Sequence, residues 1–255
     1  MEASRYHDHA RNHEFNLGRF LSPDKVGGAP ADPQGWNRYS YTLNNPLKHV
    51  DPDGNLTILV HGTFAKGRAD FLPGGSFFQN VARTVHDRTV ASFQWSGKNN
   101  HQARVGAAKA LAAFVRGYQF APGEQLNIVA HSHGGNVALA AINMSLGKPV
   151  DNLVTLGTPS RSGYRLLEPS RVSHWTNVYN SFDKIQTHGG GNYLSSFQTG
   201  PAARTEPGAL NLNWDVNLGA FESHRALHSD AAWQFTAPHL HLGSQWTNTT
   251  YVVGD

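Results

Sequence analysis

The stretch Asn127–Ala141 reads NIVAHSHGGNVALAA and places a single serine at an abrupt break in the pattern. An apolar run precedes Ser132, a histidine stands on either side of it, and two glycines follow. The run 125–131 predicts a buried strand and 135–145 predicts a helix, with the serine at their junction. In open α/β folds such a junction lies at the carboxyl edge of the sheet, where ligands bind.

The residues two before and two after Ser132 are Ala130 and Gly134, and both are as small as a very tight strand-to-helix turn requires. Such a turn, a nucleophile elbow, holds the serine hydroxyl exposed and aims the next amide at the same point. Its common form is GxSxG, and here alanine replaces the first glycine. For the pentapeptide alone, a helix N-cap is the competing interpretation, because serine is favoured there. The strand before it and the helix after it favour the nucleophile.

From Leu56 onward the chain alternates apolar strands with helical segments, which predicts an α/β fold with a mostly parallel sheet and helices on both faces. Strands are expected at 56–62, 89–95, 125–131, 151–157, 175–181 and 214–221, and helices at 76–86, 101–120, 135–145 and 229–235. Little remains for a cap domain apart from 159–174 and 186–213, and the second has the Gly- and Ser-rich composition of a mobile flap.

Residues 1–55 differ in composition and are rich in turn-forming residues, tyrosine and asparagine. We therefore predict a boundary between a leader, 1–55, made of short hairpins or partly disordered, and a catalytic domain, 56–255. The leader has too few regularly spaced apolar residues for a core of its own.

Composition excludes several classes. Of 255 residues, 39% are hydrophobic and 15% charged, as in a compact domain. No apolar run approaches the roughly 20 residues that span a bilayer, and no signal peptide is apparent; we expect a protein of the bacterial cytoplasm or one delivered by a dedicated secretion system. The net charge is +3 with no basic run, so no nucleic-acid partner is expected. Without cysteine or an HExxH helix, we expect neither metal nor cofactor.

An elbow serine needs two amide donors for the developing oxyanion, one directly after the nucleophile and one from the loop after an earlier strand. The sequence LVHGTFAKG fits the second requirement, because Thr63 comes just beyond the end of the first strand. We therefore predict the backbone amides of Thr63 and His133 as the oxyanion donors.

A serine nucleophile also needs a histidine base and an acid, which follow in the order Ser, acid, His in this type of fold. Asp183 comes just after a β-rich run and is the predicted acid. Asp151 precedes its strand and Asp215 opens the last expected strand, so both should face the opposite edge. For the base, FESHRALHSDAAW offers His224 and His228; we favour His224, which follows the last expected strand more closely, and leave His228 open. His188 is a remoter candidate.

With these residues in place, the region from about Leu56 to Phe235 resembles the lipases and esterases of the α/β-hydrolase fold. The segments LVHGT, VAHSHGG, LVTLGTPS, NSFDKI and SHRALHSDAAW carry this resemblance. It implies an α/β-hydrolase fold with a minimal cap or none, and a carboxylic ester hydrolase that acts through an acyl-enzyme with no cofactor.

Residues 14–54 resemble the closing end of the core domain of RHS-repeat proteins, which encapsulate a variable C-terminal toxin. LGRFLSPDKVGG and NRYSYTLNNPLKHVDPDG carry this second resemblance. It implies self-cleavage by paired aspartates corresponding to Asp24 and Asp51, although the first tetrad, DKVG, lacks the usual proline and the spacing is lengthened. It also implies an RHS shell or an immunity protein as partner.

The leading hypothesis is thus a serine hydrolase acting on ester or lipid substrates, with a transient membrane-surface contact as one option and an antibacterial effector module as its setting. One alternative is a phospholipase or thioesterase acting on membrane lipids. Another is a catalytically silent module in which the hydrolase scaffold binds a partner and Ser132 only caps a helix.

Overall fold

The computed structural model describes residues 55–85, 89–120, 123–189 and 201–241, and the backbone of three short strands near the N-terminus. These strands, β1 (Arg5–Asp8), β2 (Arg11–Glu14) and β3 (Arg19–Phe20), pair antiparallel in the order β1-β2-β3. The predicted boundary at residue 55 stays a prediction. Asp24, Asp51 and the middle of the expected flap, 190–200, lie outside the described residues.

The centre of the fold is a six-stranded sheet whose strands are all parallel, in the order β5-β4-β6-β7-β8-β9. The strands are β4 (Leu56–Val60), β5 (Thr89–Phe93), β6 (Leu126–His131), β7 (Val150–Leu156), β8 (Val172–Tyr179) and β9 (Leu210–Asn213). Because β4 and β6 are the second and third strands in this order, the loop after β4 lies next to the elbow after β6.

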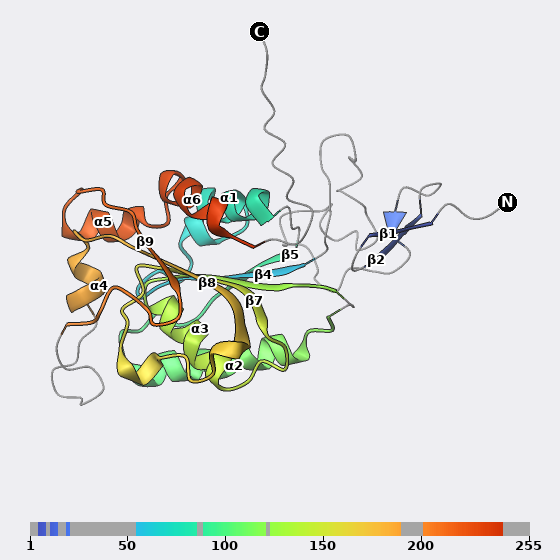
Figure 1. The fold of residues 1–255 in the computed structure, drawn as a ribbon, viewed down its shortest axis with the longest axis horizontal. Helices are drawn as coiled ribbons and strands as arrows, with labels where there is room; N and C mark the ends of the chain where they lie inside the picture. Colours follow the sequence, from blue (N-terminus) through green and yellow to red (C-terminus); the bar gives the residue numbers. More distant parts are fainter. Residues whose placement is uncertain are drawn as a thin grey trace, which may run out of the picture.

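Helices cover both faces of the sheet. In Figure 1, α1 and α6 lie on one face and α2 and α3 on the other, while α4 and α5 lie beyond the carboxyl ends of the strands. The helices are α1 (Ser76–Val85), α2 (His101–Gly117), α3 (His133–Asn143), α4 (Lys184–His188), α5 (Ala220–Ala226) and α6 (Asp230–Thr236), with short 3-10 turns η2 (Ala69–Phe71), η3 (Ser162–Tyr164), η4 (Pro169–Arg171) and η5 (Ala237–His239). The helix α4 was not expected from the sequence.

The two-sided burial follows from the alternation of side chains along the central strands. In β4, Leu56, Ile58 and Val60 enter the core under α2 and α3, whereas Leu59 enters the core under α1 and α6. The strand β6 repeats the pattern, with Ile128 on the first side and Val129 on the second. A strand buried on both faces reads as a continuous apolar run, as LTILV does.

The predicted α/β-hydrolase fold is confirmed by this all-parallel sheet with helices on both faces. One element was assigned wrongly: the last strand is β9 at Leu210–Asn213, and residues 214–221 are not a strand but lead into α5. Two of the apolar residues that suggested a strand there are exposed, Leu218 by 52% and Phe221 by 71%, whereas Trp214 packs against the core beside β9. The stretch therefore starts on the core but does not continue as a strand.

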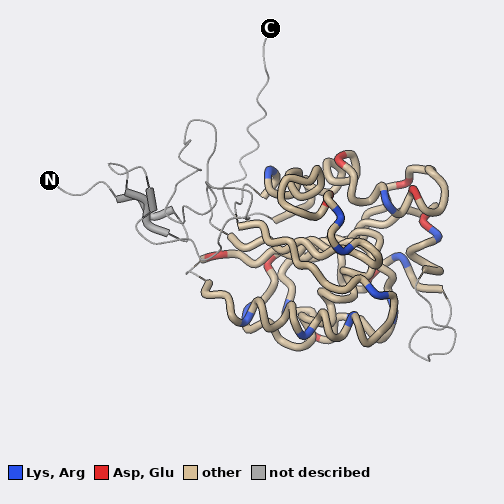
Figure 2. The backbone as a smooth tube through the Cα atoms, turned by 180° about the vertical axis from the view of Figure 1, so that it is seen from behind, with Lys and Arg blue, Asp and Glu red and all other residues tan. Residues whose placement is uncertain are grey.

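Basic and acidic residues are mixed along the described parts of the chain. Figure 2 shows Lys and Arg interspersed with Asp and Glu along the described residues. Within those residues, none of the helices combines the length and the apolar character needed to cross a membrane.

The start of α3 lies directly against the end of β4. A Cβ atom on Gly134 would sit 2.5 Å from the Val60 carbonyl oxygen and 2.6 Å from that of His61. Both neighbours are backbone atoms, so neither can turn aside. This contact fixes the distance between the elbow and the loop after β4.

Replacing Gly134 by alanine should therefore destabilise the protein by about 1–3 kcal/mol, the usual cost of overpacking a close contact. Gly106 is the matched control, because it is exposed on α2 and a Cβ there meets nothing within 4 Å; alanine at 106 should stabilise by about 0.5–1 kcal/mol. Urea titrations followed by tryptophan fluorescence measure both changes. Equal stability of Gly134→Ala and the parent protein would contradict the close approach of α3 to β4.

Candidate active site

Ser132 lies between β6 and α3 in a conformation that only a strong local framework can hold. Its φ of 55° and ψ of −134° fall outside the regions that L-residues usually occupy. The Ser132 amide donates to the Leu156 carbonyl at 2.8 Å, and the Thr158 hydroxyl donates to the Ser132 carbonyl at 3.0 Å. Gly135 makes room for Thr158, whose Oγ1 would lie 2.0 Å from a Cβ at 135. Both backbone groups of the serine are thus anchored to β7 and the loop after it.

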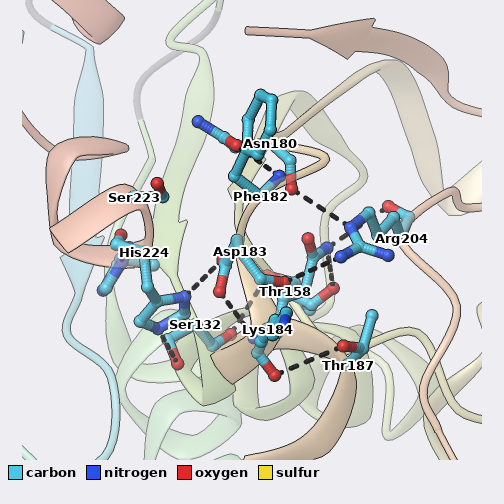
Figure 3. Close-up of polar contacts among 12 residues, drawn as sticks. Ser132, Thr158, Asn180, Phe182, Asp183, Lys184, Thr187, Arg204, Ser223 and His224 are labelled. Atoms are coloured by element: carbon cyan, nitrogen blue, oxygen red, sulfur yellow. Dashed lines mark hydrogen bonds and ion pairs between the residues drawn. The ribbon is translucent and has the colours of Figure 1, made fainter. Parts of the chain in front are cut away.

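The structure brings Ser132, His224 and Asp183 into one hydrogen-bonded chain (Figure 3). The His224 Nε2 lies 2.9 Å from the Ser132 Oγ, and the His224 Nδ1 lies 2.6 Å from the Asp183 Oδ2. Because an ionised carboxylate can only accept, Nδ1 carries the ring proton and Nε2 accepts from the serine hydroxyl. The three side chains come from the loops after β6 and β8 and from α5. All three residues are buried: Ser132 is 7% exposed, Asp183 0% and His224 8%.

Asp183 is oriented by the short helix that it starts. Its Oδ1 accepts from the Gln186 amide at 2.8 Å, so the carboxylate caps α4 with one oxygen and contacts His224 with the other. Arg204 donates to the carbonyls of Asn180 at 3.1 Å, Ser181 at 2.9 Å and Asp183 at 3.0 Å, which fixes the turn before the helix (Figure 3). The sequence predicted neither the capping of α4 by Asp183 nor the contacts of Arg204 with the turn. The Asp-x-x-Gln spacing is a helix-start signal that could have revealed α4.

The backbone of His224 is hydrogen-bonded to His131, the residue directly before Ser132. The His131 Nε2 lies 3.1 Å from the His224 carbonyl oxygen, so it donates there, and the two rings are 4.7 Å apart. Burial, and then the neighbouring His228 and His224, hold the pKa of His131 well below its usual range. A neutral donor therefore links β6 to α5.

The loop after β4 lies against the serine. A Cβ on Gly62 would sit 2.7 Å from the Ser132 Cβ, which places Thr63 beside the elbow. The His61 Nδ1 lies 2.8 Å from the Gly62 carbonyl and its Nε2 accepts from the Trp95 amide at 3.2 Å. In the planar Gly62–Thr63 peptide, the Thr63 N–H points away from the carbonyl that faces His61. The next amide, of Phe64, donates to Gly97 at 2.9 Å and is already used.

His133 is the first residue of α3. Amides at this position have no partner within their helix and carry the positive end of its dipole. Of the two predicted oxyanion donors, His133 thus follows Ser132 directly, and Thr63 follows Gly62, which lies against the serine. Their role as donors stays a prediction.

His228, the alternative base, lies in an aromatic cluster rather than on the serine. Its ring centroid is 5.2 Å from that of Phe71, 5.8 Å from that of Phe77 and 4.7 Å from that of His131. Burial, followed by the charge of Arg68, lowers the pKa of His228 to about 4. Ser229, directly after it, caps α6 through its hydroxyl.

The remaining candidates are elsewhere. Asp151 lies at the amino end of β7, where it accepts from the Leu126 amide. His188 ends α4 as an exposed residue, with its Nδ1 2.7 Å from the Thr187 hydroxyl. Asp215 requires a correction, since it follows β9 instead of opening a strand; it accepts from the Ser181 amide at 2.7 Å.

No three His, Asp or Glu side chains of the described ranges converge in a way that could hold a metal ion.

Comparison with known proteins gives a partial family match. Residues 85–186, less than half of the chain, match the model of a family described as Alpha/beta hydrolase. This match covers β6, the elbow, β7, β8 and Asp183, and it agrees with the topology described above.

Among solved structures, an alpha-beta serine hydrolase homologue from Coxiella burnetii is 12% identical, covers 75% of this chain and 89% of its own, and has a TM-score of 0.46. Lipase B from Aspergillus fumigatus is 17% identical, covers 86% of this chain and 63% of its own, and also has a TM-score of 0.46.

Two curated proteins share a short similar segment. The tRNA nuclease WapA of Bacillus subtilis (strain 168) is 42% identical over 59 residues, which are 23% of this chain and 2% of that protein. The tRNA3(Ser)-specific nuclease WapA of Bacillus spizizenii matches with the same figures.

The two histidine candidates should respond differently to alanine. His224→Ala should lower the kcat/KM for an activated ester by roughly 10⁴-fold or more, as loss of a base that acts together with its nucleophile does. His228→Ala should instead remove buried ring contacts and destabilise by about 1–3 kcal/mol, with kcat/KM retained to within about tenfold. Steady-state kinetics and urea unfolding of both variants separate the two effects. Collapse of turnover in the His228 variant alone would transfer the role of base to His228.

Proposed function

We propose that this chain is a serine hydrolase that cleaves carboxylic esters. The observation that carries the proposal is the hydrogen-bonded chain from Ser132 through His224 to Asp183, at 2.9 and 2.6 Å, on a backbone with a φ of 55° at the serine. A helix cap needs neither the positive φ nor a histidine on the hydroxyl, and the Ser132 side chain makes no cap hydrogen bond to α3.

The proposed reaction is acyl transfer. His224 takes the proton from Ser132 as Oγ attacks the ester carbonyl, and the Thr63 and His133 amides stabilise the negative oxygen that forms. His224 then passes the proton to the departing alcohol, which leaves an acyl group on Ser132. Water, deprotonated by His224, attacks that acyl group; the C–O bond to Ser132 then breaks, His224 returns the proton to Oγ, and the acid leaves. Asp183 keeps the imidazole in the tautomer that can accept the serine proton.

We place the enzyme in a toxin-like setting. The resemblance of residues 14–54 to the end of an RHS core and the short match to WapA both support this setting. The similarity covers only 2% of WapA, so its nuclease activity is not carried over. An RHS shell and an immunity protein are the partners that this setting implies, and delivery by a secretion system is the route.

Ser132→Ala should abolish hydrolysis of a short p-nitrophenyl ester and leave the fold intact. The change removes one hydroxyl group, and within the described site this hydroxyl hydrogen-bonds to His224 alone. The expected loss in kcat is roughly 10⁴-fold or more, with a small residual rate due to the oxyanion donors. Circular dichroism and the melting temperature control for folding. Turnover by the alanine variant at the parent rate would remove Ser132 as the nucleophile.

A further inference from the structure

The side chain of His133 has a buried polar atom that the proposed mechanism does not use. His133 is 4% exposed, and its Nδ1 lies 2.9 Å from the Asn136 Nδ2, which donates to it. The ring proton is then on Nε2, which is buried and has no hydrogen-bond partner in the described part of the chain. The Gly189 backbone lies near the ring but is outside hydrogen-bonding geometry for that atom. A buried donor left unused costs about 1–3 kcal/mol, so it suggests a ligand.

Two buried arginines come from the elements that pack against α3, which are α2 and η3. Arg104, on α2, is 0% exposed; its Nε donates to the Tyr164 hydroxyl at 2.8 Å, and its guanidinium lies 5.6 Å from the Tyr164 ring centroid. Arg161 is 7% exposed and stands directly before η3, which packs against α3. We call His133, Arg104 and Arg161 the basic corner.

Electrostatics in the basic corner favour a negative ligand. Burial first, and then the charges of Arg104 and Arg161, hold the pKa of His133 well below its usual range. Burial and the neighbouring Arg104 also lower the pKa of Arg161. The amino end of α3 adds the positive end of a helix dipole at the same place. An anion there would interact favourably with all of these groups, and His133 would meet it as a neutral N–H donor.

We propose that the basic corner binds an anionic group of the ester substrate, a carboxylate or a phosphate, carried a few bonds from the scissile carbonyl. This proposal rests on the proposed hydrolase function. The anionic group must lie only a few bonds from the scissile carbonyl, because His133 directly follows the nucleophile Ser132 and the Cα atoms of the two residues are about 3.8 Å apart. Charge-assisted hydrogen bonds to a carboxylate or phosphate are among the stronger ones in proteins.

Two pairs of esters test the proposal and tell the acyl side from the alcohol side. The first compares p-nitrophenyl hemiglutarate with p-nitrophenyl pentanoate, and the second compares 1-butyrylglycerol 3-phosphate with 1-butyrylglycerol. We expect the wild-type kcat/KM to favour the anionic member of at least one pair by about tenfold or more, which corresponds to about 1.4 kcal/mol. Because the site is buried, the preference should persist in 0.5 M NaCl, which screens exposed charges.

Arg161→Gln should lower that preference at least tenfold. The matched control is Arg116→Gln, at the other end of α2, where an exposed arginine donates to the Ser145 carbonyl; it should leave the preference unchanged. Each preference is a ratio measured on one sample, so a partial loss of folded protein does not affect it. If Arg161→Gln fails to fold, the wild-type comparison decides alone.

A wild-type preference near or below one in both pairs would overturn the proposal, as would an undiminished preference in Arg161→Gln. Loss of the preference in 0.5 M NaCl would also overturn it, because it would point to exposed charges instead of the basic corner. If the folded protein hydrolyses none of the four esters, the proposed function is refuted, and this inference with it.

Discussion

The backbone of Ser132 is held at a φ of 55°, and every other part of the candidate site is arranged around that constraint. Such a conformation costs about 1–3 kcal/mol in a residue other than glycine, so the surroundings must impose it. The serine amide and carbonyl are both tied to the strand β7 and its following loop. Gly134 and Gly135 let α3 approach β4 and Thr158 more closely than any larger residue would allow. The strain is therefore maintained by contacts at the centre of the sheet.

Burial also gives the histidines around the serine different roles. Desolvation holds the pKa values of His61, His131 and His133 below their usual range, and His228 is lowered to about 4. The rings of His61 and His131 hold backbone groups, and the ring of His228 packs among aromatic side chains. His224 forms an ion-pair contact with the carboxylate of Asp183, which is completely buried. Position relative to one acid thus distinguishes the base from its neighbours.

Much of this arrangement could be predicted from the sequence, because the strong signals are local. A continuous apolar run predicts a strand that is buried on both faces, and small residues around Ser132 predict the elbow. These signals are enough to predict the fold class and the residues that meet at Ser132. Edge elements were harder. The strand β9 reads LNLN, and three of its four residues are exposed, so it lacks the apolar pattern of the central strands. The contacts of Arg204 with the turn at Asp183 and of His131 with His224 join distant segments, and local patterns do not encode them.

The central claim is that Ser132 is a nucleophile activated by His224. Reaction of the full chain with a fluorophosphonate, followed by intact-mass and peptide mass spectrometry, tests it without assuming any substrate. The account predicts a single adduct, on the peptide that carries Ser132, and a rate of labelling that falls by orders of magnitude in His224→Ala. A folded protein that stays unlabelled, or that carries the adduct on another residue, would contradict the account.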